Sequence, residues 1–223
     1  MRLGDPGQSD GEDATPRTFS EASLAPVFEL NRLFFDALVE AACRPASEVG
    51  PRLASTLQGP LLQLTSAARD RLSRCPICFV DAGFHDDERW ALIATQSDTQ
   101  LGSREIVFPR LQALQLAYQT LTLAWTVAQT NLEGARLIFG MTRRSARVIA
   151  KAGIQTMHRV AERHTGWIRP AWEDQSVIWQ DLIAMAMRET EPQSSLGMRA
   201  LQRRLADLEP ATGESNEIRS TRR

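Results

Sequence analysis

Hydrophobic residues recur at helical spacing over most of the chain. Between residues 26 and 44, leucine, phenylalanine and alanine repeat three and four positions apart, which predicts an amphipathic helix that Pro45 ends. Two further helical patterns cover residues 47–57 and 61–74, with Gly59 and Pro60 between them. The pattern therefore predicts a helical N-terminal unit that extends to about residue 74.

The helical period is lost between Cys75 and Phe108. Residues 75–84 form a short apolar run that suits either an extended segment or a buried turn. Residues 89–95 fit a strand and a helix equally well, because short apolar runs do not separate the two. We therefore expect an N-terminal region over residues 25–108 whose last part, 75–108, is irregular.

Residues 109–131 carry the longest helical pattern, and it is apolar on two faces. One face has the spacing of a coiled-coil seam and consists of Leu114, Tyr118, Leu121 and Trp125. The other face consists of Leu116, Leu123 and Val127. A helix that is apolar on two faces must pack against more than its own domain. The partner is either the N-terminal helices or a second copy of the chain, in which case the seam is a dimer interface.

Positive charge is concentrated in residues 141–169. A short helix over 132–139 precedes two more, with Thr142 as a capping residue, Gly153 as the turn between them and Gly166 at the end. The segment has one anion, Glu162, although the net charge of the whole chain is −1. Its seven cations are Arg143, Arg144, Arg147, Lys151, Arg159, Arg163 and Arg169.

The two ends of the chain are polar. Residues 1–24 carry five acids and two arginines among glycine, serine and proline, a composition that predicts a disordered acidic leader. A helix is expected at 173–187, and then a polar tail over 189–223 with one further helix at 198–208. No signal peptide or membrane-spanning run is found, so we expect a cytoplasmic protein without membrane contact.

The cysteine and acidic motifs favour structural roles. Cys75 and Cys78 form a C-x-x-C pair, but a zinc site needs four ligands and no second thiol pair exists. We expect buried thiols there, with zinc or redox chemistry as the alternative. The run from His85 to Glu88 is typical of a solvated loop rather than a divalent-cation site. No cofactor and no enzymatic activity are predicted.

The basic helix pair suggests binding to double-stranded DNA. Arg143, Arg144, Arg147 and Lys151 would contact phosphates. Residues nearer the bases would be Gln155, Thr156, Arg159 and Arg163. The alternative is a solvated helical face that pairs with the acids at Asp86, Asp87 and Glu88.

Residues 109–187 resemble the FlhD family of flagellar master-regulator subunits. The resemblance rests on the long leucine-rich helix LQALQLAYQTLTLAWTVAQTN, on GARLIFGM and SARVIAKAG, and on the run from Met157 to Glu162 followed by Trp167-Ile168-Arg169. It implies an all-α homodimer with intertwined long helices that activates transcription with a zinc-bearing companion subunit, FlhC. Residues 1–108 have no counterpart in that family, and the four-cysteine cluster of the companion is missing.

The sequence thus predicts an all-α fold, with an N-terminal helical unit and an FlhD-like domain over residues 109–188 that contains a helix–turn–helix-like pair. The expected function is a DNA-associated transcriptional regulator, dimeric or acting with an FlhC-like companion, with flagellar control as the process that the resemblance implies. The alternative is a helical protein–protein adaptor whose basic face meets an acidic protein.

Overall fold

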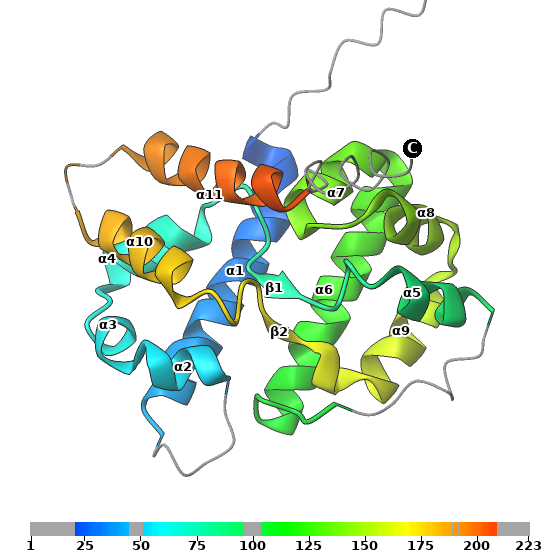
Figure 1. Cartoon of the computed structure of the whole chain (residues 1–223), viewed down its shortest axis with the longest axis horizontal. Helices are drawn as coiled ribbons and strands as arrows, with labels where there is room; N and C mark the ends of the chain where they lie inside the picture. The colour runs from blue at the N-terminus through cyan, green and yellow to red at the C-terminus, as the bar shows by residue number, and fades with distance from the viewer. Residues whose placement is uncertain (1–20, 45–50, 96–103, 189, 191, 209–223) are drawn as a thin grey trace, which may run out of the picture.

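The computed structural model describes residues 21–44, 51–95, 104–188, 190 and 192–208, and this part of the chain is all-α (Figure 1). It contains eleven α-helices, a short 3₁₀ helix and two strands of two residues each. The helices are α1 (Glu21–Ala42), α2 (Arg52–Thr56), α3 (Gln58–Leu62), α4 (Ser66–Ser73), α5 (Asp87–Ala94), α6 (Arg110–Thr130), α7 (Leu132–Phe139), α8 (Arg143–Lys151), α9 (Ile154–Arg163), α10 (Ser176–Met187) and α11 (Gln193–Leu208). The remaining elements are η2 (Thr165–Trp167), β1 (Val80–Asp81) and β2 (Arg169–Pro170).

The first helix starts earlier than its sequence pattern indicates. α1 begins at Glu21 and contains Pro26, and Leu24 is buried. Pro26 is the sixth residue of α1, past the first four N–H groups that have no helical acceptor, so α1 continues through it at the loss of one backbone hydrogen bond. The predicted disordered leader is therefore wrong for residues 21–24, and residues 1–20 lie outside the described part of the chain.

The short helices α2 to α4 divide the chain at a different place from the predicted one. Gly59 and Pro60 lie inside α3, and the chain breaks at residues 63–65 instead. There the Thr65 hydroxyl accepts a hydrogen bond of 3.1 Å from the Ala68 N–H and caps α4. The predicted helix over 61–74 is therefore interrupted, because a side-chain cap starts a new helix.

The segment that sequence periodicity left ambiguous contains both an extended piece and a helix. β1 pairs antiparallel with β2, with Val80 opposite Pro170 and Asp81 opposite Arg169. Residues 87–94 form α5, and the carboxylate of Asp86 accepts a hydrogen bond of 3.0 Å from the Arg89 N–H at the start of this helix. The interpretation of 89–95 as a strand is thus excluded.

The long helix α6 is the centre of the molecule. It packs against α1 on one side and against α7, α8 and α9 on the other (Figure 1). Pro109 precedes α6, and Asn131 ends α6 and caps α7 through its side-chain oxygen, 2.8 Å from the Gly134 N–H. The helix that was predicted over 109–131 is confirmed, and its two apolar faces both pack within the chain.

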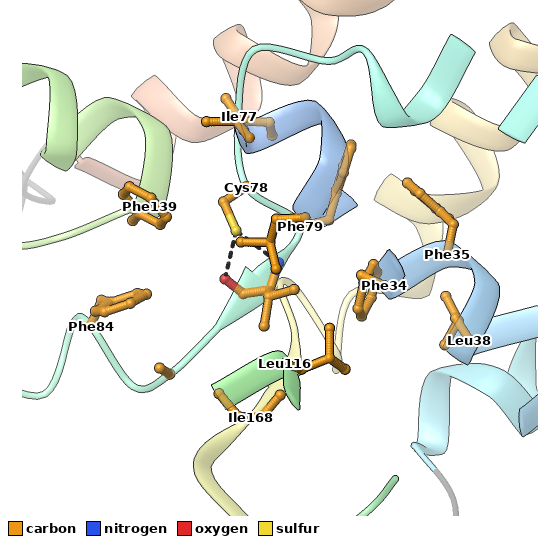
Figure 2. Close-up of a cluster of buried hydrophobic side chains, with 14 of the residues drawn as sticks. Phe34, Phe35, Leu38, Ile77, Cys78, Phe79, Phe84, Leu116, Phe139 and Ile168 are labelled. Atoms are coloured by element: carbon orange, nitrogen blue, oxygen red, sulfur yellow. Dashed lines mark hydrogen bonds between the residues drawn. The ribbon is translucent and has the colours of Figure 1, made fainter. Parts of the chain in front are cut away.

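The buried side chains of the two halves form one hydrophobic cluster. Figure 2 shows side chains of α1, α6 and α7 gathered around the segment that carries Cys78 and Phe79. Phe35 and Phe79 meet edge to face with ring centroids 5.2 Å apart, and Trp179 of α10 lies 5.3 Å from Phe79. The extended segment before α5 therefore joins the N-terminal helices to the rest of the fold.

A buried asparagine fixes this extended segment. Asn31 of α1 is fully buried, and its amide nitrogen lies 3.2, 3.3 and 2.8 Å from the carbonyl oxygens of Ser73, Cys75 and Ile77. Its side-chain oxygen accepts a hydrogen bond of 3.0 Å from the Phe79 N–H. One side chain thus satisfies the backbone of a buried segment that has no regular structure to do so.

The C-terminal helix belongs to the core. α11 begins at Gln193, and Leu196 and Ala200 are fully buried, so the prediction of a polar tail is wrong for residues 193–208. The guanidinium of Arg204 is also buried, donates a hydrogen bond of 2.8 Å to the Cys78 carbonyl and lies 4.7 Å from the centre of the Trp172 ring. Among the described residues, no helix combines the length and apolar character needed to cross a membrane.

Candidate nucleic-acid interface

Helix α8 separates apolar and charged residues onto opposite faces. It starts at the predicted cap, where the Thr142 hydroxyl accepts a hydrogen bond of 3.0 Å from the Ser145 N–H. Ala146 and Ile149 are buried against the neighbouring helices. The four cations of the opposite face are exposed, and we call them the α8 basic face: Arg143, Arg144, Arg147 and Lys151.

The charge of the α8 basic face is only weakly compensated. Arg143 lies 4.0 Å from a carboxylate oxygen of Glu133, and both side chains are mostly exposed. For Arg144, Arg147 and Lys151, no ion pair is found with any residue in the described ranges. Exposed pairs at this separation contribute little, so the face keeps most of its positive potential.

The nearby acids have other partners. Asp86 pairs with Arg89 at 3.2 Å, within the first turn of α5. The carboxylate of Asp87 accepts a hydrogen bond from the hydroxyl of Thr142, which holds the start of α8 against α5. The structure therefore does not contain the ion pairs between this acidic cluster and the basic helix that the alternative requires.

Two residues, Ala152 and Gly153, connect α8 to α9. Gly153 has φ −78° and ψ 152°, an ordinary extended conformation, and a Cβ atom there would meet nothing within 4 Å. The turn therefore does not require glycine, contrary to the sequence interpretation. It is held instead by Trp125 of α6, whose indole N–H donates a hydrogen bond of 2.7 Å to the Ala152 carbonyl.

Helix α9 presents fewer groups to solvent than predicted. Gln155 and Arg163 are exposed, whereas Thr156 and Arg159 are half-buried, and two guanidinium nitrogens of Arg159 are shielded from solvent. α9 also ends at Arg163, and Gly166 belongs to the 3₁₀ turn that follows. The four predicted base-contacting residues thus do not form one exposed row.

One of the seven cations has a structural role. Arg169 lies in β2, donates a hydrogen bond of 2.7 Å to the Glu105 carbonyl and has a Glu173 carboxylate oxygen at 4.0 Å. Burial is the main influence on this guanidinium and lowers its pKa from the ordinary value. The Arg169 side chain therefore connects β2 to the segment before α6 and does not extend the α8 basic face.

Two residues of the predicted dimer seam, Tyr118 and Trp125, contact α9 and the connecting turn of their own chain. Leu121 is only 2% exposed. The Tyr118 hydroxyl donates to Glu162, and its ring meets His158 edge to face at 5.2 Å. Trp125 binds the Ala152 carbonyl, and Leu114 is half-buried. Internal packing therefore accounts for Leu121 and for the polar groups of Tyr118 and Trp125, and contact of this face with a second copy stays a prediction.

The cysteine pair is part of the core, as expected. Cys75 and Cys78 are fully buried, and burial raises the pKa of each thiol to about 12. Such thiols stay protonated at neutral pH and are poor nucleophiles and metal ligands. His85 is 75% exposed and 3.7 Å from Asp81. In the described ranges, no group of three or more histidine, cysteine and acidic side chains converges on one point.

The contact between Thr142 and Asp87 was not predicted, although it fixes where α8 begins. The two residues are 55 positions apart, and each was interpreted only as part of its own local motif. No periodicity signals such a contact.

Comparisons with family models, with curated proteins and with solved structures find no match to this chain.

Proposed function

We propose that the protein is a DNA-associated transcriptional regulator that contacts double-stranded DNA through the α8 basic face. The observation that carries the proposal is the row of exposed cations, of which only Arg143 has an ion pair with a described residue. Arginine and lysine side chains on one helical face suit phosphate oxygens. In this proposal, α8 and α9 act as a helix–turn–helix-like pair.

The exposed residues of the pair suggest separate roles. Arg143, Arg144, Arg147 and Lys151 would anchor phosphates, whereas Gln155 and Arg163 are the exposed α9 side chains that could approach base edges. Thr156 and Arg159 are less suited to this role because they are half-buried. Control of flagellar genes is part of the proposal only through the FlhD resemblance.

Self-association or a companion subunit also belongs to the proposal, since operator-binding proteins commonly use two-fold symmetry. Leu121 is buried within its own chain, so an assembly of folded chains would reach only the half-buried residues of the predicted seam, Leu114, Tyr118 and Trp125. Sedimentation of the purified chain measures whether it is a dimer.

The test is fluorescence anisotropy with a labelled 30-base-pair duplex across a range of salt concentrations. If three or four phosphates are neutralised, the slope of log K against log salt is about −2.7 to −3.6, so affinity falls about 40- to 150-fold between 50 and 200 mM salt. The variant with Arg143→Glu, Arg144→Glu and Arg147→Glu should lose binding.

A matched control makes the same change of charge elsewhere. Arg32, Arg52 and Arg110 are exposed and lie on α1, α2 and the first turn of α6, away from α8 in Figure 1. A variant with all three changed to glutamate should retain most of the affinity. Equal loss in both variants would mean that only net charge matters. Failure of the wild type to bind duplex at micromolar concentration would favour the adaptor alternative.

A further inference from the structure

The α8 basic face has a counterpart of opposite charge in the same chain. Residues 5–13, with the sequence DPGQSDGED, contain four carboxylates and no cation. The α8 basic face carries four cations, and the described acids with a contact at this face or its cap are Glu133 beside Arg143 and Asp87 at the hydroxyl of Thr142. Both of these acids lie near the start of α8, so the part around Arg147 and Lys151 is the least compensated.

The chain leaves the described structure at a place from which residues 5–13 can reach α8. Glu21 and Leu24, at the start of α1, share a surface hollow with Gly197 and Met198 of α11. α11 packs on α7, and α7 packs on α8, and Figure 1 shows the start of α1 and helices α7 and α8 at the same end of the molecule.

The length of chain is sufficient for this path. Packed helix axes lie about 8–10 Å apart, so the two packed steps from α11 through α7 to α8 cover ~16–20 Å, and the start of α1 lies across one surface hollow from α11. The stretch from Asp13 to Glu21 spans up to ~26–29 Å when it is extended. Asp5, Asp10 and Glu12 lie farther along the chain and have more reach.

We propose that residues 5–13 bind the α8 basic face of their own chain and compete there with DNA. The competition rests on the proposed function, whereas the contact between the two segments does not. A tethered segment at roughly millimolar effective concentration, with a Kd of ~0.1 mM for the face, would raise the Kd for DNA roughly tenfold. The effect decreases with salt, because exposed charges are screened.

The contact is tested by paramagnetic relaxation in the full chain. A nitroxide is attached to Ser9→Cys in a Cys43→Ser background, since Cys75 and Cys78 are buried. At low salt, the amide signals of Arg143–Lys151 should broaden more than those of Ser176–Met187, and the difference should vanish at 0.5 M salt. It should also vanish when the four cations of the face are changed to glutamine. Dilution of the labelled chain with unlabelled ¹⁵N chain separates contacts within a molecule from contacts between molecules.

The competition is tested by anisotropy with the variant Asp5→Asn, Asp10→Asn, Glu12→Gln and Asp13→Asn. This variant should bind the 30-base-pair duplex about tenfold more tightly than the wild type at low salt and equally at high salt. Broadening that is uniform over the helices, or that persists in the glutamine variant, would overturn the contact. An unchanged Kd for DNA would overturn the competition. Selective broadening without any duplex binding would leave the contact standing and refute the proposed function instead.

Discussion

The substitution Asn31→Ala tests how the irregular segment before β1 is held. In the structure, the Asn31 side chain is the hydrogen-bond partner of the Phe79 N–H at 3.0 Å and of the Ile77 carbonyl at 2.8 Å. Alanine would leave both groups buried without that partner. An orphaned buried donor or acceptor costs about 1–3 kcal/mol, so the pair gives about 2–6 kcal/mol of lost stability. That is a large part of the 5–15 kcal/mol typical of a folded domain.

Urea unfolding monitored by tryptophan fluorescence measures the effect, as a shift in the midpoint at unchanged m value. Asn131→Ala is the matched control, because Asn131 caps α7 with a single hydrogen bond of 2.8 Å to the Gly134 N–H. Loss of that cap should cost about 1 kcal/mol. If Asn31→Ala costs no more than Asn131→Ala, the segment does not depend on Asn31, and our account of it is wrong.

Three other predictions concern glycine, leucine and cysteine residues. Gly140→Ala should destabilise the fold by about 2 kcal/mol or more, because Gly140 has φ +71° and a Cβ would lie 2.4 Å from a nitrogen of Arg204. Gly153→Ala should be neutral or stabilise the fold by up to ~1 kcal/mol in the same urea assay. Equal effects would contradict the structure. Leu121→Asp should abolish cooperative unfolding by circular dichroism rather than release a folded monomer, because Leu121 is 2% exposed, whereas Leu111→Asp, at a site 81% exposed, should be tolerated. A folded Leu121→Asp monomer would restore the seam interpretation. Finally, burial raises the pKa of Cys75 and Cys78 from the ordinary 9.0 to about 12, so the unfolded chain loses these protons first. Stability is therefore kept below pH 9 and falls between pH 9 and about 12, by up to ~1.4 kcal/mol per pH unit and thiol. A double Cys→Ala variant should lack this part of the slope, and identical slopes would refute it.

Sequence periodicity was sufficient where local signals and burial agreed. The helices from α6 to α8 lie close to their predicted positions, because Pro109, Asn131, Gly140 and Thr142 act through contacts within a few residues. The helix α11 was underestimated, because its surface is mostly polar and its one buried stripe is short. Arg204 adds to this difficulty, since an arginine gives no sign in the sequence that it will be buried.

Long-range contacts explain the remaining differences. β1 and β2 are two residues each and about 90 positions apart, so neither has a strand signal of its own. For the candidate site, the excess of cations was evident from composition, but two other facts were not. One is that Asp87 binds Thr142 rather than an arginine, and the other is that Arg159 and Arg169 turn toward the protein. Only the tertiary arrangement decides which charges face outward.

The single hydrophobic cluster has a consequence for genetics. Because α1, the segment around Phe79 and the helices beneath α8 share one core, a substitution far from the basic face can unfold the helix that carries it. Buried positions outnumber the four cations of that face by a wide margin. A random screen for loss of function would therefore recover mostly alleles in the core. Alleles of the basic face would be recognised by normal protein levels in the cell, since their products fold and accumulate.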